Sequence, residues 1–142
     1  MAESRVLVDS SIWIEGLDAR GPASLKQPLK ALIESGRAVI TEMVRLEVTG
    51  GARSDKEFED FRADFSAVEC LKITDHEWRL AETLSFNLNR KGQRVPATDL
   101  LIAAVAVSHK VPLWHADSDF ERVRAAAPDF HTYWHPKRFP II

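Results

Sequence analysis

The chain has little of several features that would assign it to other protein classes. It has 142 residues and a single cysteine, Cys70, which excludes an internal disulfide and a zinc site built from cysteines. The longest apolar run, residues 100–107, is far shorter than the ~20 residues of a membrane-spanning helix. The first residues contain no apolar stretch of signal-peptide length. These absences predict a cytoplasmic protein with no membrane association.

Neither sign of charge dominates the composition. Lys and Arg number 19 against 21 Asp and Glu, for a formal net charge of −2, which argues against a histone-like, non-specific binder of nucleic acid. The balance does not argue against an enzyme acting on nucleic acid, because a sum near zero can hide separate acidic and basic regions. With 45% hydrophobic and 28% charged residues, the chain is expected to form one globular domain over residues 1–142.

Short apolar runs alternate with segments of helical spacing along the chain. Continuous runs at residues 6–8, 38–40 and 111–115 predict strands that are covered on both faces, as in parallel sheets. A capping-box pattern that begins at Thr74 predicts the start of a long helix, and Thr98 is expected to cap the apolar helix after it. The alternation predicts a three-layer α/β/α sandwich around a largely parallel sheet.

Acidic residues fall where these predicted strands end or where the next helices begin. Asp9 follows the first predicted strand, and Asp117 lies two residues past a later one. Asp99 lies in the first turn of the apolar helix, and Glu47 lies in the helix after residues 38–40. Ligands of open parallel sheets bind beyond the carboxyl ends of the strands, so these acids are positioned to converge. Taken singly, each acid also fits an ordinary role as a helix cap, a dipole partner or a solvated surface group.

Converging carboxylates repel one another and raise each other's pKa values, and a bound divalent cation removes that repulsion. The candidate ligands are all oxygens, which favours Mg²⁺, with Mn²⁺ as a substitute, over Zn²⁺. Glu42 is an alternative to Glu47 because it lies closer to the end of its strand. We prefer Glu47 because two glycines, Gly50 and Gly51, follow it.

Four segments, in order along nearly the whole chain, carry a resemblance to a known family. They are residues 8–11 (VDSS), 47–51 (EVTGG), 96–104 (PATDLLIAA) and 113–120 (LWHADSDF). Together they resemble the PIN domain, and more specifically the VapC ribonuclease toxins of bacterial toxin–antitoxin pairs. Each motif alone is weak, but four in series are specific.

The resemblance implies a Mg²⁺-dependent endoribonuclease of a type II toxin–antitoxin system, in which metal-activated water cleaves RNA. Its implied partners are the RNA substrate, a cognate VapB-like antitoxin and a second copy of the chain. The implied metal-binding and catalytic residues are four acids: Asp9, Glu47, Asp99 and Asp117. The hydroxyls of Ser10 and Thr98 would orient these acids or water, and Asp119 would complete or support the cluster. Helices near the amino terminus would hold the antitoxin, with any exposed part of Trp13 and Leu17 contributing.

One departure from the family concerns His115, which stands where Thr or Ser is frequent. His115 would either contact a phosphate or pack beside the site, and we favour packing. An acidic site must still attract a polyanion, so cations should surround it. The candidates for binding RNA are Arg90, Lys91 and Arg94 in the loop before Asp99, followed by Arg45, Arg53, Lys137 and Arg138.

Two other functions remain open at this point. A phosphatase or phosphotransfer domain would form an aspartyl phosphate on Asp9, but it would want a second aspartate where Ser11 stands. It would also want a lysine near the site, and Lys110 lies at the far end of its predicted helix. A non-catalytic module that binds RNA or protein would have no need of four repelling carboxylates.

Overall fold

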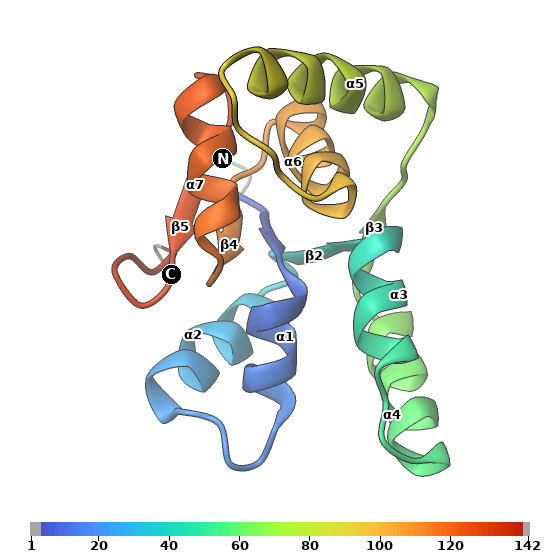
Figure 1. Cartoon of the computed structure of the whole chain (residues 1–142). Coiled ribbons are helices and arrows are strands. Elements are labelled where there is room, and N and C mark those ends of the chain that lie inside the picture. The colour runs from blue at the N-terminus through green and yellow to red at the C-terminus, as the bar shows by residue number, and fades with distance from the viewer. Residues whose placement is uncertain (1–3, 141–142) are drawn as a thin grey trace.

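The computed structural model describes residues 4–140 and contains a five-stranded sheet between layers of helices (Figure 1). The strand order is β3-β2-β1-β4-β5, and every neighbouring pair is parallel. This confirms the predicted three-layer α/β/α arrangement around a parallel sheet. The strands are β1 (Val6–Val8), β2 (Ala38–Thr41), β3 (Glu69–Leu71), β4 (Leu113–His115) and β5 (Thr132–Trp134).

The described residues form seven helices, which divide between the two faces of the sheet. Helices α1 to α4 connect β1 through β2 to β3, and right-handed crossovers place them on one face. Helices α5 to α7 connect β3 through β4 to β5 and cover the other face, as Figure 1 shows for α5 and α6. The helices are α1 (Ser10–Leu17), α2 (Ala23–Glu34), α3 (Glu42–Gly50), α4 (Asp55–Ser66), α5 (Asp75–Arg90), α6 (Ala97–His109) and α7 (Ser118–Ala126).

The order of the strands creates a switch in direction beside β1. From β1 the chain moves outward to β2 and β3, then returns to fill the other side with β4 and β5. The connections that leave β1 and β4 therefore run in opposite directions and open a crevice at the carboxyl ends of these strands. Asp9 and Asp117 lie at this crevice because each follows one of the two strands.

The central strands and helix α6 are apolar because they are buried in the core. Leu7, Val39 and Leu113 have no exposed surface, because the central strands are covered by helices on both faces. Helix α6 is buried at every position from Leu100 to Ala106, as expected for a helix that is apolar on all sides. Within residues 4–140, no helix is long and apolar enough to span a bilayer.

The start of α6 differs from the sequence-based expectation. Helix α6 begins at Ala97, and the carbonyl oxygen of Pro96 accepts hydrogen bonds from the amides of Asp99 and Leu100, both at 3.1 Å. Thr98 is therefore already inside the helix, and the predicted cap at Thr98 is wrong. The fixed φ angle of proline suits the entry into a helix, so Pro96 takes the cap position although it has no side-chain acceptor.

The capping box at Thr74 is present and also joins α5 to α6. The backbone amide and the hydroxyl of Thr74 donate to Glu77 Oε1 at 2.7 and 2.6 Å, and Ser108 Oγ on α6 donates to Glu77 Oε2 at 2.5 Å. Burial raises the pKa of Glu77, but the hydrogen bonds from Ser108 and Thr74 outweigh burial and lower the pKa to about 2.

Glu77→Gln is expected to lower the free energy of unfolding at pH 7 by about 2 kcal/mol, because an amide cannot accept these hydrogen bonds with a full charge. The pKa of Glu77 lies below its usual 4.5 in the folded state, so its stabilisation is complete above pH 4.5 and is lost as pH falls towards 2. Urea unfolding between pH 7 and pH 3 measures both effects. Glu82→Gln, on the exposed face of α5, is the matched control, and equal losses in the two variants would contradict the prediction.

Candidate active site

The carboxylate of Asp9 lies at the carboxyl end of β1 and caps helix α1. Its Oδ2 accepts hydrogen bonds from Ser11 N at 3.3 Å and from Ser11 Oγ at 2.7 Å. The residue is only 4% exposed; burial raises the pKa of its carboxyl, and the hydrogen bonds from Ser11 oppose that rise. Asp9 is the cap of α1 because its side chain reaches the free amide of Ser11.

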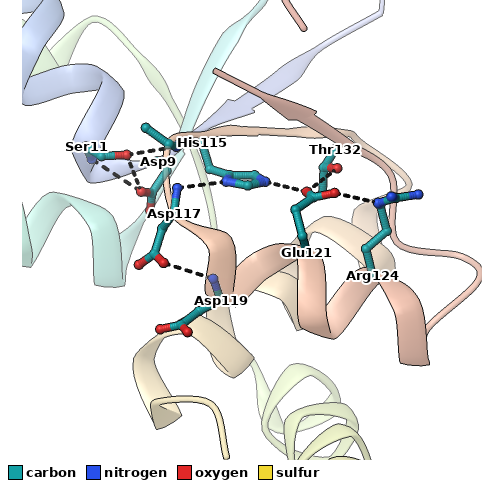
Figure 2. Close-up of polar contacts among 9 residues, drawn as sticks. Asp9, Ser11, His115, Asp117, Asp119, Glu121, Arg124 and Thr132 are labelled. Carbon is teal, nitrogen blue, oxygen red and sulfur yellow. Dashed lines mark hydrogen bonds and ion pairs between the residues drawn. The ribbon is translucent and has the colours of Figure 1, made fainter. Parts of the chain in front are cut away.

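Ser11 is a site residue that the sequence did not single out. Besides donating to Asp9, Ser11 Oγ accepts a hydrogen bond from Ala116 N at 3.3 Å, so it joins the turn after β1 to the turn after β4 (Figure 2). The spacing of Asp9 and Ser11 could have predicted the hydrogen bond between them. The contact with Ala116 could not be predicted in this way, because the two residues are far apart in the sequence. Ser10, which was predicted to orient an acid, hydrogen-bonds through its side chain to Glu47.

Three further carboxylates gather beside Asp9. Asp99, Asp117 and Asp119 each offer an oxygen, and the three oxygens lie within 4.8 Å of one another. Asp99 comes from the first turn of α6, whereas Asp117 caps α7 by accepting from the Asp119 amide at 2.9 Å. Asp119 lies in the first turn of α7 and forms an ion pair with Arg122. Two helix starts therefore bring these acids together.

The charges of the cluster are strongly coupled. Burial is the largest cause that raises the pKa of Asp99 to about 7, followed by the negative charges of Asp117, Asp9 and Glu47. This shift shows that the cluster carries more negative charge than its surroundings neutralise. Protonation of Asp99, or a cation placed among these acids, would reduce this repulsion.

The two acids of α3 have different surroundings. Burial and the charge of Asp9 raise the pKa of Glu47, while the hydrogen bond from Ser10 opposes them. Glu42 instead accepts a hydrogen bond from Ile73 N at 2.8 Å, on the side of β3. Glu47 is therefore the acid of α3 that lies beside the cluster, although it stays outside the group of three.

A buried hydrogen-bond network holds the turn that carries Asp117. His115 has no exposed surface; its Nδ1 accepts from Asp117 N at 3.1 Å, and its Nε2 lies 2.8 Å from Glu121 Oε2 (Figure 2). Glu121 also accepts from Thr132 Oγ1 and from Arg124 Nε, both at 2.7 Å. Burial lowers the pKa of His115 although Glu121 opposes this, so the ring is neutral with its proton on Nε2. Both ring nitrogens are thus engaged inside the protein.

Three of the cations predicted to contact RNA lie at the surface where α5 leads into α6. Arg90 is the last residue of α5 rather than a loop residue, and its guanidinium carbon lies 5.5 Å from the centroid of the Phe86 ring. Lys91 caps the end of α5, and Arg94 lies in the connection to α6. All three cations are exposed.

The donor set of the cluster fits a divalent metal ion. Its oxygens are close together and all come from carboxylates. Arg122 pairs with Asp119, but neighbouring acids still raise the pKa of Asp99, and hard cations prefer such an environment. Within residues 4–140 it is the only group of three or more acidic, His or Cys side chains with this spacing. The cluster could therefore bind a metal ion.

The chain matches a known protein family and is similar to several ribonucleases. The family model described as PIN domain matches residues 6–126. Ribonuclease VapC21 of Mycobacterium tuberculosis (strain ATCC 25618 / H37Rv) is 34% identical over 127 residues, which cover 86% of this chain and 88% of that protein. VapC ribonuclease Mb1587 of Mycobacterium bovis is 28% identical over 119 residues, which cover 82% and 89%.

Solved structures share the fold. VapBC-5 from Mycobacterium tuberculosis, a member of the VapBC family of toxin–antitoxin systems, aligns with a TM-score of 0.66 and 25% identity, covering 93% of this chain and 99% of that chain. VapBC2 from Rickettsia felis, bound to a DNA fragment from its promoter, aligns with a TM-score of 0.71 and 20% identity, covering 89% and 96%. The second likeness bears on the fold alone.

Proposed function

Because the chain belongs to the PIN domain family, we propose that it is a metal-dependent endoribonuclease and the toxin of a type II toxin–antitoxin pair. The observation that carries the proposal is the group of three carboxylates from α6 and α7 at the crevice beside β1. Relatives that align over most of the chain are named ribonucleases, which gives this acidic crevice its substrate class. We also propose that the protein acts in the cytoplasm, because the chain has a single cysteine and its proposed substrate is RNA.

In this proposal Asp9, Glu47, Asp99 and Asp117 hold Mg²⁺, as the resemblance implies. Asp119, whose oxygen lies within 4.8 Å of those of Asp99 and Asp117, completes the cluster. When bound, the metal neutralises charge on the scissile phosphodiester and lowers the pKa of water, so no nucleophile from the protein is required. The chain's own hydrogen bonds keep the acids in place: Ser11 fixes Asp9, and Ser10 contacts Glu47.

Phosphotransfer through Asp9 is not favoured. Its carboxylate is buried, caps α1, and already accepts two hydrogen bonds from Ser11. Lys110, the lysine that such a domain would need near the site, ends α6 at the opposite end from Asp99.

The proposed function is tested by incubating the purified protein with total RNA, with Mg²⁺ and with EDTA, and mapping the cut ends. We expect internal cuts that leave 5′-phosphates in Mg²⁺, and none in EDTA. Equal cleavage in EDTA would refute the metal mechanism, and binding of RNA without cleavage would favour the non-catalytic module.

The antitoxin partner is proposed to cover the surface between α1, α3 and α4. Trp13 is only 1% exposed and packs edge to face against Phe65 with ring centroids 5.2 Å apart, so it leaves almost no exposed part for a partner to contact. Ile14 is 52% exposed instead, and with Leu17 and Phe61 it lines a small groove on this surface. A groove lined by apolar side chains, with Ile14 exposed at it, could receive an apolar segment of a partner protein.

A second copy of the chain is proposed to cover a different apolar surface. Leu46 on α3 and Trp78 on α5 are 66% and 53% exposed, and they border a shallow groove together with Met43, Ile73 and Leu101. Large apolar groups side by side at the surface favour self-association into a homodimer.

Glu121→Ala is expected to lower the free energy of unfolding by about 2 kcal/mol, because His115 and Thr132 lose their buried acceptor. It should also lower RNA cleavage by about tenfold, as outer groups that orient metal ligands commonly do. The imidazole that accepts from the Asp117 amide would no longer be fixed in orientation or tautomer. Urea unfolding and cleavage rates at equal folded fraction measure the two effects, with Glu82→Ala as the exposed control. If Glu121→Ala cleaves RNA at the native rate at equal folded fraction, the network stabilises the fold only and the predicted effect on cleavage is wrong.

A further inference from the structure

An open groove of about 900 Å³ runs along the outer side of β5, apart from the acidic cluster. Strand β5 is at the edge of the sheet, and among the described residues it pairs with β4 alone. The groove is lined by residues of α7, of β5 and of the segment that follows β5, including Arg124, Tyr133, Trp134, Lys137 and Arg138.

Two cations of this groove are held against aromatic rings. Lys137 Nζ lies 4.1 Å from the centroid of the Trp134 ring, and the guanidinium carbon of Arg138 lies 5.1 Å from the centroid of the Tyr133 ring. Such contacts attract the cation to the ring face and limit the positions of a long side chain. The charges of Lys137 and Arg138 are therefore pre-positioned at the surface.

The groove is positive although the whole chain has a net charge of −2. Arg124 adds a third cation, while the acid that lines the groove, Glu121, has its oxygens engaged by His115, Thr132 and Arg124. Lys137 and Arg138 thus remain available to an anionic ligand.

The parallel sheet places these cations at the same edge as the acidic cluster. Trp134 at the end of β5 lies in register with His115 at the end of β4, and Asp9 follows the next strand, β1. Adjacent strands are ~4.8 Å apart, so the ends of β5 and β1 are separated by about 10 Å. Arg138 N donates to the carbonyl oxygen of Trp134 at 2.8 Å, which keeps both cations close to this strand end.

We propose that this groove binds the single-stranded RNA that flanks the cleavage position, with its phosphates contacting Lys137 and Arg138. The inference rests on the proposed ribonuclease function. The acidic cluster repels the phosphates of RNA, and the basic groove would hold the RNA beside it. A polyanion can span both places, because the groove lies within a few nucleotides of the acids. The position of these cations near the acidic cluster, at the same end of the sheet, favours RNA over an acidic protein segment.

The test measures RNA binding by the protein carrying Asp99→Asn, so that the probe stays uncut. In that background, Lys137→Ala/Arg138→Ala is compared with Lys30→Ala/Lys56→Ala, which removes the same charge from exposed positions on α2 and α4. The probe is a fluorescein-labelled single-stranded RNA of mixed sequence, titrated at several salt concentrations and followed by anisotropy.

We expect binding by the groove variant to be about tenfold weaker, with the slope of log affinity against log salt reduced by about 1.4 for two lost phosphate contacts. The control should bind like its parent, and Lys137→Arg/Arg138→Lys should retain most of the affinity because it keeps both charges available to phosphates. In the active protein the groove variant should raise KM and leave kcat nearly unchanged.

Unchanged binding by the groove variant would overturn the inference, and so would an equal loss in the control, which would show attraction by total charge alone. Loss of affinity for an acidic protein partner with RNA affinity retained would overturn it as well. The proposed function is tested by a different result: it fails if the native protein cuts no RNA in Mg²⁺. The two failures can be told apart because RNA binding is measured on the Asp99→Asn protein, which does not cleave.

Discussion

Asp99→Asn is expected to lower RNA cleavage by about 10³-fold or more. The Asp99 carboxylate lies within 4.8 Å of the oxygens of Asp117 and Asp119, and the group needs its charge to hold a divalent cation. A bound metal supplies several kcal/mol of transition-state stabilisation, and each 1.4 kcal/mol is worth about tenfold in rate. Cleavage of labelled RNA under single-turnover conditions in Mg²⁺ measures the loss.

The fold of this variant should remain intact. Asp99→Asn removes one charge from a group of mutually repelling carboxylates, so the Tm of the metal-free variant at pH 8 should equal or exceed that of the native chain. Mg²⁺ should raise the Tm of the native protein more than that of Asp99→Asn. Asp55→Asn, which removes one of the two acids in the first turn of α4, is the matched control and should cleave normally. Native cleavage by Asp99→Asn would refute the assignment of the site.

Trp114→Ala is expected to cause the largest loss of stability of any variant considered, about 3–5 kcal/mol. Trp114 has no exposed surface; it lies in β4 in register with Val8 and Tyr133, and its ring centroid is 6.3 Å from that of Phe139. Truncation leaves a cavity between the sheet and the residues that pack on it. The expected loss is a large part of the free energy of unfolding of a small domain, about 5–15 kcal/mol. Urea unfolding at pH 7 measures the change.

The function should fall with the fold in this variant, because β4 carries the site. The carbonyl oxygen of Trp114 accepts the Asp9 amide at 2.9 Å, and the next residue is His115. Trp114→Phe keeps most of the buried volume and is the control, with an expected loss of about 1 kcal/mol. A change below that value for Trp114→Ala would show that this position tolerates a cavity.

Local features of the fold were predictable from the sequence. The strand at residues 6–8 is a continuous apolar run, because a strand covered on both faces needs apolar residues at every position. The cap at Thr74 was predictable, since a capping box involves residues three apart. The first residue of α6 was not, because the competition between Pro96 and Thr98 depends on how the chain enters the helix.

Asp9, Asp99 and Asp117 could be proposed from the sequence because each lies at the end of a strand or the start of a helix. Asp119 and Glu47 were also named from the sequence, but side-chain positions were required to show that Asp119 belongs to the close group and that Glu42 points towards β3 instead. Those positions depend on how α3, α6 and α7 pack around the crevice, which no local pattern encodes.

By itself, the sequence determined the order of strands and helices and the acids at their ends, because those signals depend on near neighbours along the chain. The tertiary structure alone decided which acids meet, which serine joins β1 to β4, and which cations share an edge with the cluster. The physical reason is the parallel sheet, which aligns the carboxyl ends of strands that are far apart in sequence.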